Sequence, residues 1–288
     1  MTHIAWLGLG AMGVRMAQHL LEDGHAVTVY NRTAARTAPL VERGARAAAT
    51  PRAAVAGAEV VIAMVRDDDA SRAVWCDPDT GALAALDARA LAIASSTLTV
   101  GWTRSLAAEI ANHSGAAFLD APVLGSRPQA DARQLIHLVG GETAAVDRAR
   151  PILEALGGAL HHVGPIGHGM TMKLVANALF GAQVAALGEL LGWLDRAEVD
   201  RATALDVLGS LPIVSPAMRG IAGLISQRAF APLFPIALVE KDLGYAVAEA
   251  DAAGSPLPTV AAVRAVYADA IARGFGDDNI TGVAQLFD

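Results

Sequence analysis

The sequence has a single cysteine, Cys76, among its 288 residues. One cysteine excludes an internal disulfide framework and a metal site built from several thiolates. This favours a reducing setting, and we therefore expect a cytoplasmic protein. No partner motif surrounds Cys76, which predicts an inert thiol rather than a nucleophile. No His-x-x-x-His or carboxylate pattern accompanies His161, His162 and His168, so the sequence predicts no metal site.

Clusters of basic residues and long apolar runs are also missing. Lys and Arg number 22 against 29 Asp and Glu, and they are scattered along a chain of net charge −7. This balance argues against a nucleic-acid or anionic-membrane surface. The most apolar stretch, 172–194, falls short of the roughly 18 uninterrupted apolar residues of a membrane span. Four polar residues interrupt it: Lys173, Asn177, Gln183 and Glu189. The start, Met1–Leu9, lacks a basic segment and runs into glycines, which is typical of a strand rather than a signal peptide.

Apolar residues make up 53% of the chain, and its length suits two packed domains. In the first part, short apolar runs alternate with helical patterns. Strands are predicted at His3–Leu7, Ala26–Tyr30, Val60–Val65, Leu91–Ala94, Ala117–Asp120 and Gln134–Val139. Helices are predicted at Met12–Asp23, Ala34–Arg43, Arg52–Ala56, Ala70–Trp75 and Thr99–Ser114. This alternation predicts an α/β fold with a Rossmann-like parallel sheet covered on both faces.

From about residue 164 onward the pattern is helical only. A long helix is predicted at Gly169–Asp195, followed by helices at Ala202–Leu208, Gly220–Ser226, Val239–Ala253 and Thr259–Arg273. We therefore predict an N-terminal domain of residues 1–164 and an all-helical C-terminal domain of residues 165–288. The long interdomain helix links them, and we expect the active site between them.

Residues 8–13 have the sequence Gly-Leu-Gly-Ala-Met-Gly and lie between the first predicted strand and helix. A G-x-G-x-x-G pattern in this context predicts a dinucleotide site. Gly8 permits a tight turn, Gly10 lets the backbone approach a pyrophosphate, and Gly13 lets helix and strand pack closely. Leu9, Ala11 and Met12 complete the loop, whose helix N-terminus favours phosphates. A purely structural turn is the alternative.

Asn31, Arg32 and Thr33 follow the second predicted strand. NAD-selective folds place an acidic residue there to bind the ribose 2′-OH, and this chain has none. Arg32 can pair with a 2′-phosphate, to which Asn31 and Thr33 can donate. The sequence therefore predicts NADP as the cofactor. The alternative is that Arg32 is a solvated surface residue and that both cofactors are accepted.

Two further motifs contain candidate chemistry. The segment 120–126, Asp-Ala-Pro-Val-Leu-Gly-Ser, follows a strand, and the N–H groups of such a turn can converge on an anion. An ordinary turn is the alternative. Lys173 and Asn177 stand one turn apart on one face of the long helix. Apolar surroundings lower the pKa of a lysine and suit it for proton transfer, whereas the alternative is a lysine that merely extends to solvent.

Six motifs in this order resemble the β-hydroxyacid dehydrogenases, over essentially the whole chain. That family includes 3-hydroxyisobutyrate dehydrogenases, tartronate semialdehyde reductases and glyoxylate/succinic semialdehyde reductases. The motifs are G-L-G-A-M-G at 8–13, N-R-T at 31–33, S-S-T at 95–97, D-A-P-V-x-G-S at 120–126, G-H-G-x-x-x-K-x-x-x-N at 167–177 and K-D-L at 241–243. The N-R-T segment and residues 125–128 are most similar to the glyoxylate/succinic semialdehyde reductase branch.

The resemblance implies hydride transfer between NADP(H) and a small carboxylate-bearing aldehyde or hydroxy acid. Glyoxylate, succinic semialdehyde and 3-hydroxyisobutyrate represent the implied substrate class. Lys173 would act as the general acid, and Asn177 would orient the substrate or the lysine. The other implied substrate contacts are Thr97, Asp242, the N–H groups of Leu124, Gly125 and Ser126, and Phe234 as an apolar wall. Beyond the glycine loop and residues 31–33, the implied cofactor contacts are Met64, Val65, Ser96, Thr97 and Lys241.

Leu124 departs from the family pattern, which usually has serine there. The change removes a hydroxyl donor to the substrate carboxylate, so a bulkier or less polar substrate is an alternative. An imine reductase or a non-catalytic NADP-binding homologue is a rival on the same fold. Imine reductases usually have aspartate or tyrosine in place of the lysine, and non-catalytic homologues tend to lose it, so Lys173 argues against both. The apolar helical faces predict a homodimer or homotetramer.

Overall fold

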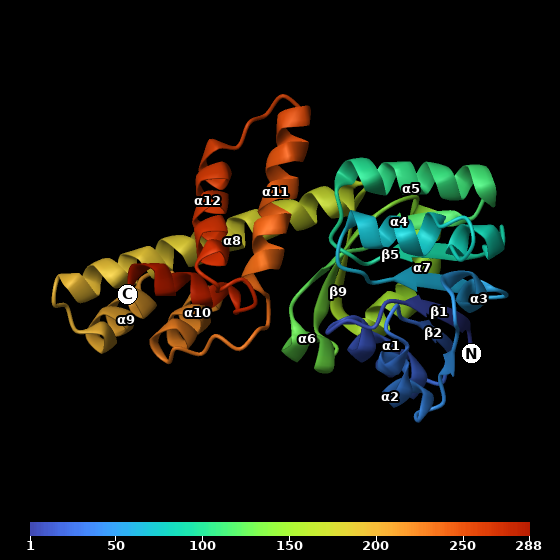
Figure 1. Cartoon of the computed structure of the whole chain (residues 1–288), viewed down its shortest axis with the longest axis horizontal. Helices are drawn as coiled ribbons and strands as arrows, with labels where there is room; N and C mark the ends of the chain where they lie inside the picture. The colour runs from blue at the N-terminus through green and yellow to red at the C-terminus, as the bar shows by residue number, and fades with distance from the viewer. The chain divides into compact units, whose positions relative to one another are not determined.

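The computed structural model describes residues 1–288 (Figure 1). Its internal contacts divide the chain into two compact units, Met1–Lys173 and Leu174–Asp288. The division falls inside the long helix α8 (His168–Arg196), later than the boundary predicted between residues 164 and 165. The first turns of this helix therefore pack as part of the first unit.

The first unit is built on one nine-stranded sheet. Its strands are β1 (His3–Leu7), β2 (Ala26–Tyr30), β3 (Arg46–Ala47), β4 (Val60–Ala63), β5 (Leu91–Ala94), β6 (Ala117–Asp120), β7 (Val123–Leu124), β8 (Leu135–Gly140) and β9 (Gly157–Gly164). Their order is β3-β2-β1-β4-β5-β6-β8-β7, with β9 also paired to β8. The strands from β3 to β6 in this order are parallel, whereas β8 is antiparallel to β6 and β7. The predicted Rossmann-like parallel sheet is confirmed, and it has an antiparallel extension at one edge.

Helices cover both faces of this sheet, as Figure 1 shows. On one face, α1 (Gly13–Glu22) contacts α6 (Arg127–Asp131) and α7 (Thr143–Leu156). On the other face lie α3 (Pro51–Val55), α4 (Asp68–Cys76) and α5 (Val100–His113). Strands β4 and β5 are buried along their whole length. That double coverage explains why these strands are continuous apolar runs rather than alternating ones.

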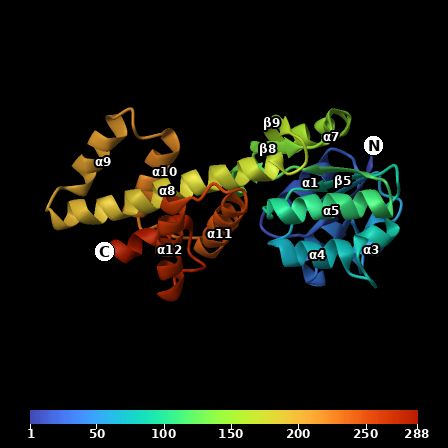
Figure 2. The same cartoon turned by 90° about the horizontal axis from the view of Figure 1, so that it is seen from above.

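The second unit is entirely helical, as predicted. It contains the rest of α8, then α9 (Arg201–Ser210), α10 (Pro216–Ser226), α11 (Ile236–Ala252), α12 (Pro258–Ala272) and the 3₁₀ segment η3 (Ile280–Phe287). Figure 2 shows α9 and α10 on one side of α8, and α11 and α12 on the other. The Tyr267 hydroxyl of α12 donates to the Gly181 carbonyl of α8 over 2.9 Å. A Cβ at Gly192 would lie 2.6 Å from the Phe287 carbonyl oxygen, so only glycine lets η3 approach α8 this closely.

Several elements differ from the predicted ones. The predicted helix at Ala34–Arg43 is a 3₁₀ turn η1 (Ala34–Thr37) and a short helix α2 (Ala38–Val41). The strand predicted at Val60–Val65 ends at Ala63, because the chain leaves the sheet there. Helix α7 was not predicted, and Pro151 in its interior lacks the N–H that a helical pattern requires. The short β3 and β7 have two residues each, which is too few for a periodic signal.

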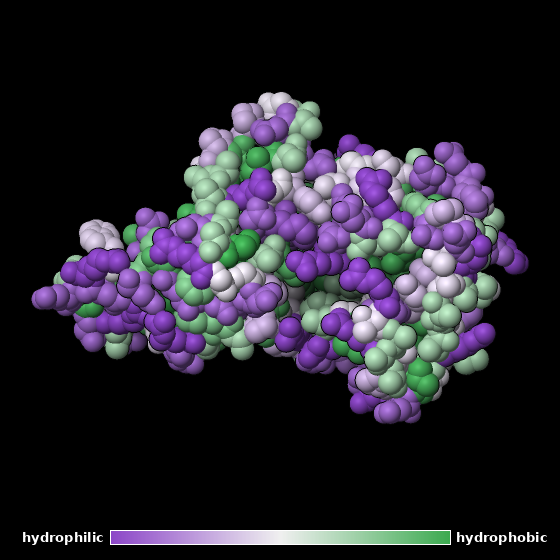
Figure 3. Space-filling model, viewed as in Figure 1, coloured by the Kyte–Doolittle hydropathy of each residue, from purple (hydrophilic) through white to green (hydrophobic).

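Helix α8 is long and apolar enough to cross a membrane by length and composition alone. The core helix of a soluble protein passes the same test, and 44% of its most apolar window is buried inside the molecule. On the face that Figure 3 shows, hydrophilic side chains predominate and apolar ones form small groups among them. Helix α8 is therefore partly packed inside the molecule and partly exposed, with Leu179 and Trp193 among its exposed apolar residues.

Candidate active site

Four parallel strands of the first unit end in register at one edge of the sheet. The register pairs are Leu7 with Ala63, Ala63 with Ala94, and Ala94 with Asp120. Strand β2 ends on the same line, since Tyr30 pairs with Leu7. The loops that follow β1, β2, β4 and β5 contain residues 8–13, 31–33, 64–65 and 96–97. The structure therefore brings the predicted site residues of these four loops to a single edge, where ligands bind in open parallel sheets. Strand β6 is followed by Ala121, Pro122 and then β7, which contains Leu124, so Gly125 and Ser126 lie further along the chain.

The glycine loop after β1 has the shape that a dinucleotide requires. A Cβ at Gly8, whose φ is +105°, would lie 2.3 Å from the Met64 carbonyl oxygen. A Cβ at Gly13 would lie 2.2 Å from the Gly8 carbonyl oxygen. A Cβ at Gly10 would meet nothing within 4 Å. The close packing around Gly8 and Gly13 thus leaves no room for a side chain, whereas Gly10 faces open space, as a close approach of the dinucleotide to the backbone requires. Leu9 is buried, while Ala11 is exposed.

The loop after β2 is braced by Asn31. Its Oδ1 accepts a hydrogen bond from the Leu9 N–H over 2.9 Å, and its Nδ2 donates to the Thr33 carbonyl over 2.9 Å. Asn31 therefore ties the glycine loop to the loop that carries Arg32. Arg32 and Thr33 are exposed. Arg36, one turn further in η1, is a second exposed arginine and lies outside the predicted motif.

The loops after β4 and β5 are joined by Ser96. The Ser96 hydroxyl accepts a hydrogen bond from the Val65 N–H over 2.7 Å, and the residue is 1% exposed. This hydroxyl holds Met64 and Val65 in place, so its structural task is to support the loop. Met64, Val65 and Thr97 are half-buried and remain accessible at the edge.

The loop between β7 and α6 is organised as a helix cap. Gly125 has a φ of +114°, and Ser126 forms a capping box with Gln129 at the start of α6. The Ser126 N–H donates to the Gln129 side chain over 2.9 Å. This N–H, which we expected to hold the substrate carboxylate, is thus already engaged. Leu124 is half-buried and Gly125 is exposed.

Arg127 is the next residue and was not among the predicted site residues. Its Nε is buried without a hydrogen-bond partner. The helix that it begins, α6, is attached to α1 by an ion pair between Arg15 and Asp131 (2.7 Å). The His19 ring nitrogen Nε2 and the Ala130 carbonyl form a second link of 2.9 Å. Arg127 therefore places a cation directly after Gly125 and Ser126, at the start of a helix that is attached to α1. Its position directly after the D-A-P-V-x-G-S motif was the sequence signal for it.

Lys173 lies in α8 and is 9% exposed. The chain has only two lysines, Lys173 and Lys241, and both belong to the predicted site. The helix runs unbroken from His168 to Arg196, so Asn177 follows Lys173 by one turn on the same helix. This confirms the predicted spacing of the pair along one helix.

In the second unit, Asp242 organises two other predicted residues. Its Oδ2 accepts from Asn177 Nδ2 over 2.6 Å, and its Oδ1 lies 2.7 Å from Lys241 Nζ. Asp242 is 3% exposed, and the Lys241 ammonium also lies 4.4 Å from the centre of the Tyr245 ring. A carboxylate only accepts hydrogen bonds, so the Asn177 NH₂ group, and not its Oδ1, faces Asp242. Phe234 is half-buried just before α11, with its N–H donated to Asn279 over 3.0 Å.

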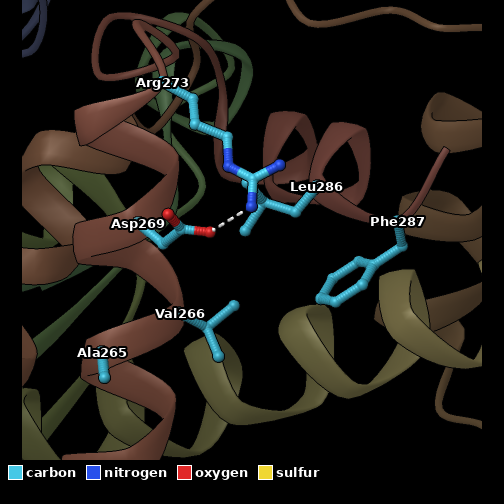
Figure 4. A pocket seen from close by; sticks show the side chains of 6 residues that line it. All are labelled: Ala265, Val266, Asp269, Arg273, Leu286 and Phe287. Carbon is cyan, nitrogen blue, oxygen red and sulfur yellow. Dashed lines mark ion pairs between the residues drawn. The ribbon is translucent and has the colours of Figure 1, made fainter.

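No group of three or more His, Cys, Asp or Glu side chains is arranged to hold a metal ion. Partial burial and Glu109 raise the pKa of Cys76, which keeps its sulfur a thiol at neutral pH. A pocket of about 330 Å³ lies between α12 and η3 (Figure 4). Asp269 and Arg273 pair beside it over 2.9 Å, and Val266 and Phe287 point into it. It contains none of the predicted site residues.

Comparison with known proteins identifies the family. Residues 3–164 match the model for the NAD binding domain of 6-phosphogluconate dehydrogenase. Residues 167–287 match the model for the NAD-binding domain of NADP-dependent 3-hydroxyisobutyrate dehydrogenase. The chain belongs to the β-hydroxyacid dehydrogenase family. The predicted resemblance is confirmed, and the protein is an NAD(P)-dependent oxidoreductase of this family.

The names of individual relatives of this chain refer to different substrates. Glyoxylate/succinic semialdehyde reductase 1 of Arabidopsis thaliana is 30% identical over 98% of this chain and 97% of its own. The NAD-dependent L-serine dehydrogenase of Pseudomonas aeruginosa is 34% identical over 100% and 98%. The structure of Mycobacterium tuberculosis 3-hydroxyisobutyrate dehydrogenase with L-serine superposes with a TM-score of 0.90 at 31% identity, covering 99% of both chains.

Two alanine substitutions separate the fold of the glycine loop from its binding role. Gly13→Ala places a Cβ against the Gly8 carbonyl, and we expect it to destabilise the protein by about 1–3 kcal/mol. The Cβ of Gly10→Ala would contact no atom of the protein. We therefore expect an unchanged melting temperature but weaker binding of the dinucleotide, which the added methyl group would contact. Thermal unfolding and fluorescence titration with NADPH measure the two effects. A Gly10→Ala protein with normal NADPH affinity contradicts this assignment.

Proposed function

We propose that the protein transfers hydride between NADP(H) and a small carboxylate-bearing aldehyde or hydroxy acid. Glyoxylate, succinic semialdehyde and 3-hydroxyisobutyrate represent the substrate class. The observation that carries the proposal is the common edge of the sheet, at which the loops after β1, β2, β4, β5 and β6 emerge together. The reductase and dehydrogenase names of the relatives support the same chemistry.

Lys173 is the proposed general acid. The bound nicotinamide cofactor supplies or accepts the hydride. In reduction, Lys173 Nζ donates a proton to the substrate carbonyl oxygen, and in oxidation it removes the hydroxyl proton. Asn177, with its NH₂ turned to Asp242, offers Oδ1 as an acceptor that orients the Lys173 ammonium or the substrate hydroxyl. Asp242 therefore acts through Asn177 rather than on the substrate, which refines the role first implied for it.

Carboxylate recognition is the proposed task of the loop between β7 and α6. The Ser126 N–H is engaged by Gln129, so the Gly125 N–H, the Ser126 hydroxyl and Thr97 are the proposed donors. The Arg127 guanidinium adds a charged donor where Leu124 lacks the hydroxyl of the usual serine. Phe234 supplies an apolar wall for the rest of the substrate. Lys241, held by Asp242, is the proposed cofactor contact from the helical unit.

Activity measurements with a panel of substrates test this function. We expect NADPH oxidation with at least one of glyoxylate, succinic semialdehyde, methylmalonate semialdehyde and tartronate semialdehyde. Lys173→Ala should lower kcat/KM by about 10²–10⁴-fold, because the proton donor is lost. The dinucleotide affinity of this variant should stay unchanged. Full activity in Lys173→Ala contradicts the role of the lysine.

A cyclic imine in the same panel addresses the two rival functions. Turnover of the imine alone indicates an imine reductase. Binding of NADPH without turnover of any carbonyl or imine indicates a non-catalytic homologue. The presence of Lys173, buried in α8, favours carbonyl chemistry over both.

The preference for NADP is proposed to come from Arg32 and Thr33, with Arg36 as a further cation. Arg32→Glu should raise the KM for NADPH by about ten- to a hundredfold, since it removes a charge-assisted hydrogen bond and adds repulsion. The KM for NADH should change much less. Arg89→Glu, at an exposed arginine paired with Asp87, is the matched control. An equal loss with both cofactors shows that Arg32 does not contact the 2′-phosphate.

A homo-oligomer, dimer or tetramer, is the proposed state in the cytoplasm, with a second copy of the chain on the outer face of α8. Apolar side chains on that face are exposed at Val175, Leu179, Leu190 and Trp193, of which Trp193 is 66% exposed. Trp193→Glu should shift the protein toward the monomer in size exclusion with light scattering, because it charges an apolar interface. Ile213→Glu, at a still more exposed apolar residue outside the helices, should not. A monomeric wild-type protein overturns this proposal.

A further inference from the structure

We infer that Asp120 is a positioning residue for Lys173, which it holds by capping the helix that carries the lysine. This inference rests on the proposed role of Lys173 as the general acid. Asp120 is the last residue of β6 and is fully buried. The family motif places it beside the substrate loop, but no role was assigned to it from the sequence.

The Asp120 carboxylate binds the start of α8 with both oxygens. Oδ1 accepts from the Gly167 N–H over 2.8 Å, and Oδ2 accepts from the Met170 N–H over 2.8 Å. These N–H groups lie at the helix N-terminus, where no helical carbonyl is available to them. The residue before the helix is Gly167, which has no side chain to cap with. A carboxylate from the sheet, 47 and 50 residues earlier in the chain, therefore performs the task of a local cap.

Two glycines make room for this carboxylate. A Cβ at Gly140 would lie 2.5 Å from Asp120 Oδ1. A Cβ at Gly169 would lie 2.9 Å from Asp120 Oδ2, and still closer, 2.4 Å, to the Leu138 carbonyl oxygen. Each contact is closer than a real Cβ approaches another atom. The surroundings of Asp120 are thus shaped around the carboxylate, which indicates a fixed anchor rather than a solvated side chain.

Met170 attaches the same helical turn to a second loop. Its N–H donates to Asp120, and its sulfur accepts the Leu98 N–H over 3.1 Å. Leu98 follows Thr97 in the loop after β5. The first turn of α8 is therefore tied to both loops from which substrate contacts are proposed. Lys173 follows Met170 by three residues, so its backbone position is fixed relative to those loops.

The charge of Asp120 also bears on the charge of Lys173. The N-terminus of a helix has partial positive character, which disfavours a nearby ammonium and is strongest in the first turn. A carboxylate on that terminus offsets this effect. Burial raises the pKa of Asp120, while the N–H donors of Gly167 and Met170 and the nearby His168 act in the opposite direction. An anion on these two N–H groups therefore favours the protonated form of Lys173, from which the proton is donated.

Asp120→Asn tests this inference, because it keeps the size of the side chain but removes its charge and one acceptor. We expect kcat for the best substrate of the panel to fall about tenfold or more, at an unchanged Kd for NADPH. We also expect the pKa of Lys173 to fall by about one unit, since the compensating charge is lost. The alkaline limb of the kcat/KM profile should move in the same direction. Asp200→Asn, at the N-cap of α9 (Asp200 accepts from Thr203 N–H over 2.8 Å), is the matched control.

The decisive measurement is an NMR titration of Lys173, which is simple to interpret because the chain has only two lysines. In protein labelled with ¹³C,¹⁵N-lysine, only Lys173 and Lys241 give side-chain signals, and Lys241→Arg assigns them. A purely structural Asp120 would lower the melting temperature of Asp120→Asn and leave the Lys173 titration and the pH profile unchanged, which overturns the inference. The titration of Lys173 requires no turnover. It therefore tests the effect of Asp120 even if Lys173→Ala keeps its activity, a result that would contradict only the proposed function.

If Asp120→Asn does not fold, Met170→Leu tests the same turn with the carboxylate intact. Loss of the sulfur acceptor for the Leu98 N–H should lower kcat several-fold and change the Lys173 chemical shifts, while its pKa is retained. An unchanged kcat together with unchanged Lys173 signals then overturns the inference.

Discussion

The structure depends on one constraint: parallel strands of the sheet end together. Strands β1, β4, β5 and β6 stop in register at Leu7, Ala63, Ala94 and Asp120. Each loop that leaves this edge starts from the same line, so residues widely separated in sequence become neighbours. Helices on both faces of the sheet exclude water from β4 and β5, which are fully buried, and so keep the ends of these strands in place. A shift of one strand by one residue would misplace the loop that follows it.

Hydrogen bonds between polar side chains and distant backbone groups fix the loops at this edge. Asn31 links the loop after β2 to the glycine loop, and Ser96 links the loops after β4 and β5. In the helical unit, Asp242 holds Asn177 and Lys241 in the same manner. A buried polar group that loses its partner costs about 1–3 kcal/mol, so these networks resist rearrangement. Several of the predicted site residues are thus held by hydrogen bonds within the protein.

The sequence predicted the elements and motifs whose signal is local. Glycines 8, 10 and 13, the long helix and the central strands are visible as spacing and periodicity along the chain. Three hydrogen bonds could not be predicted in the same way: Ser126 with Gln129, Ser96 with Val65, and Asp120 with Met170. These contacts depend on the three-dimensional path of the chain, and serine or aspartate in a motif has the same appearance whether it touches substrate or supports a loop. Helix α7 was missed for a local reason, the proline in its interior.

Helix α8 belongs to both compact units, and this limits how the two halves of such a protein can be recombined between relatives. A chimera of two relatives that is joined near residue 164 takes Lys173 and Asn177 from one parent. In that chimera, Gly167 and Met170 of this parent must bind the Asp120 of the other parent. A crossover at residue 173 preserves the Asp120 contacts and separates the origin of the lysine from that of the asparagine. The anchor and the polar pair are therefore expected to be inherited as one block that extends across the division between the units.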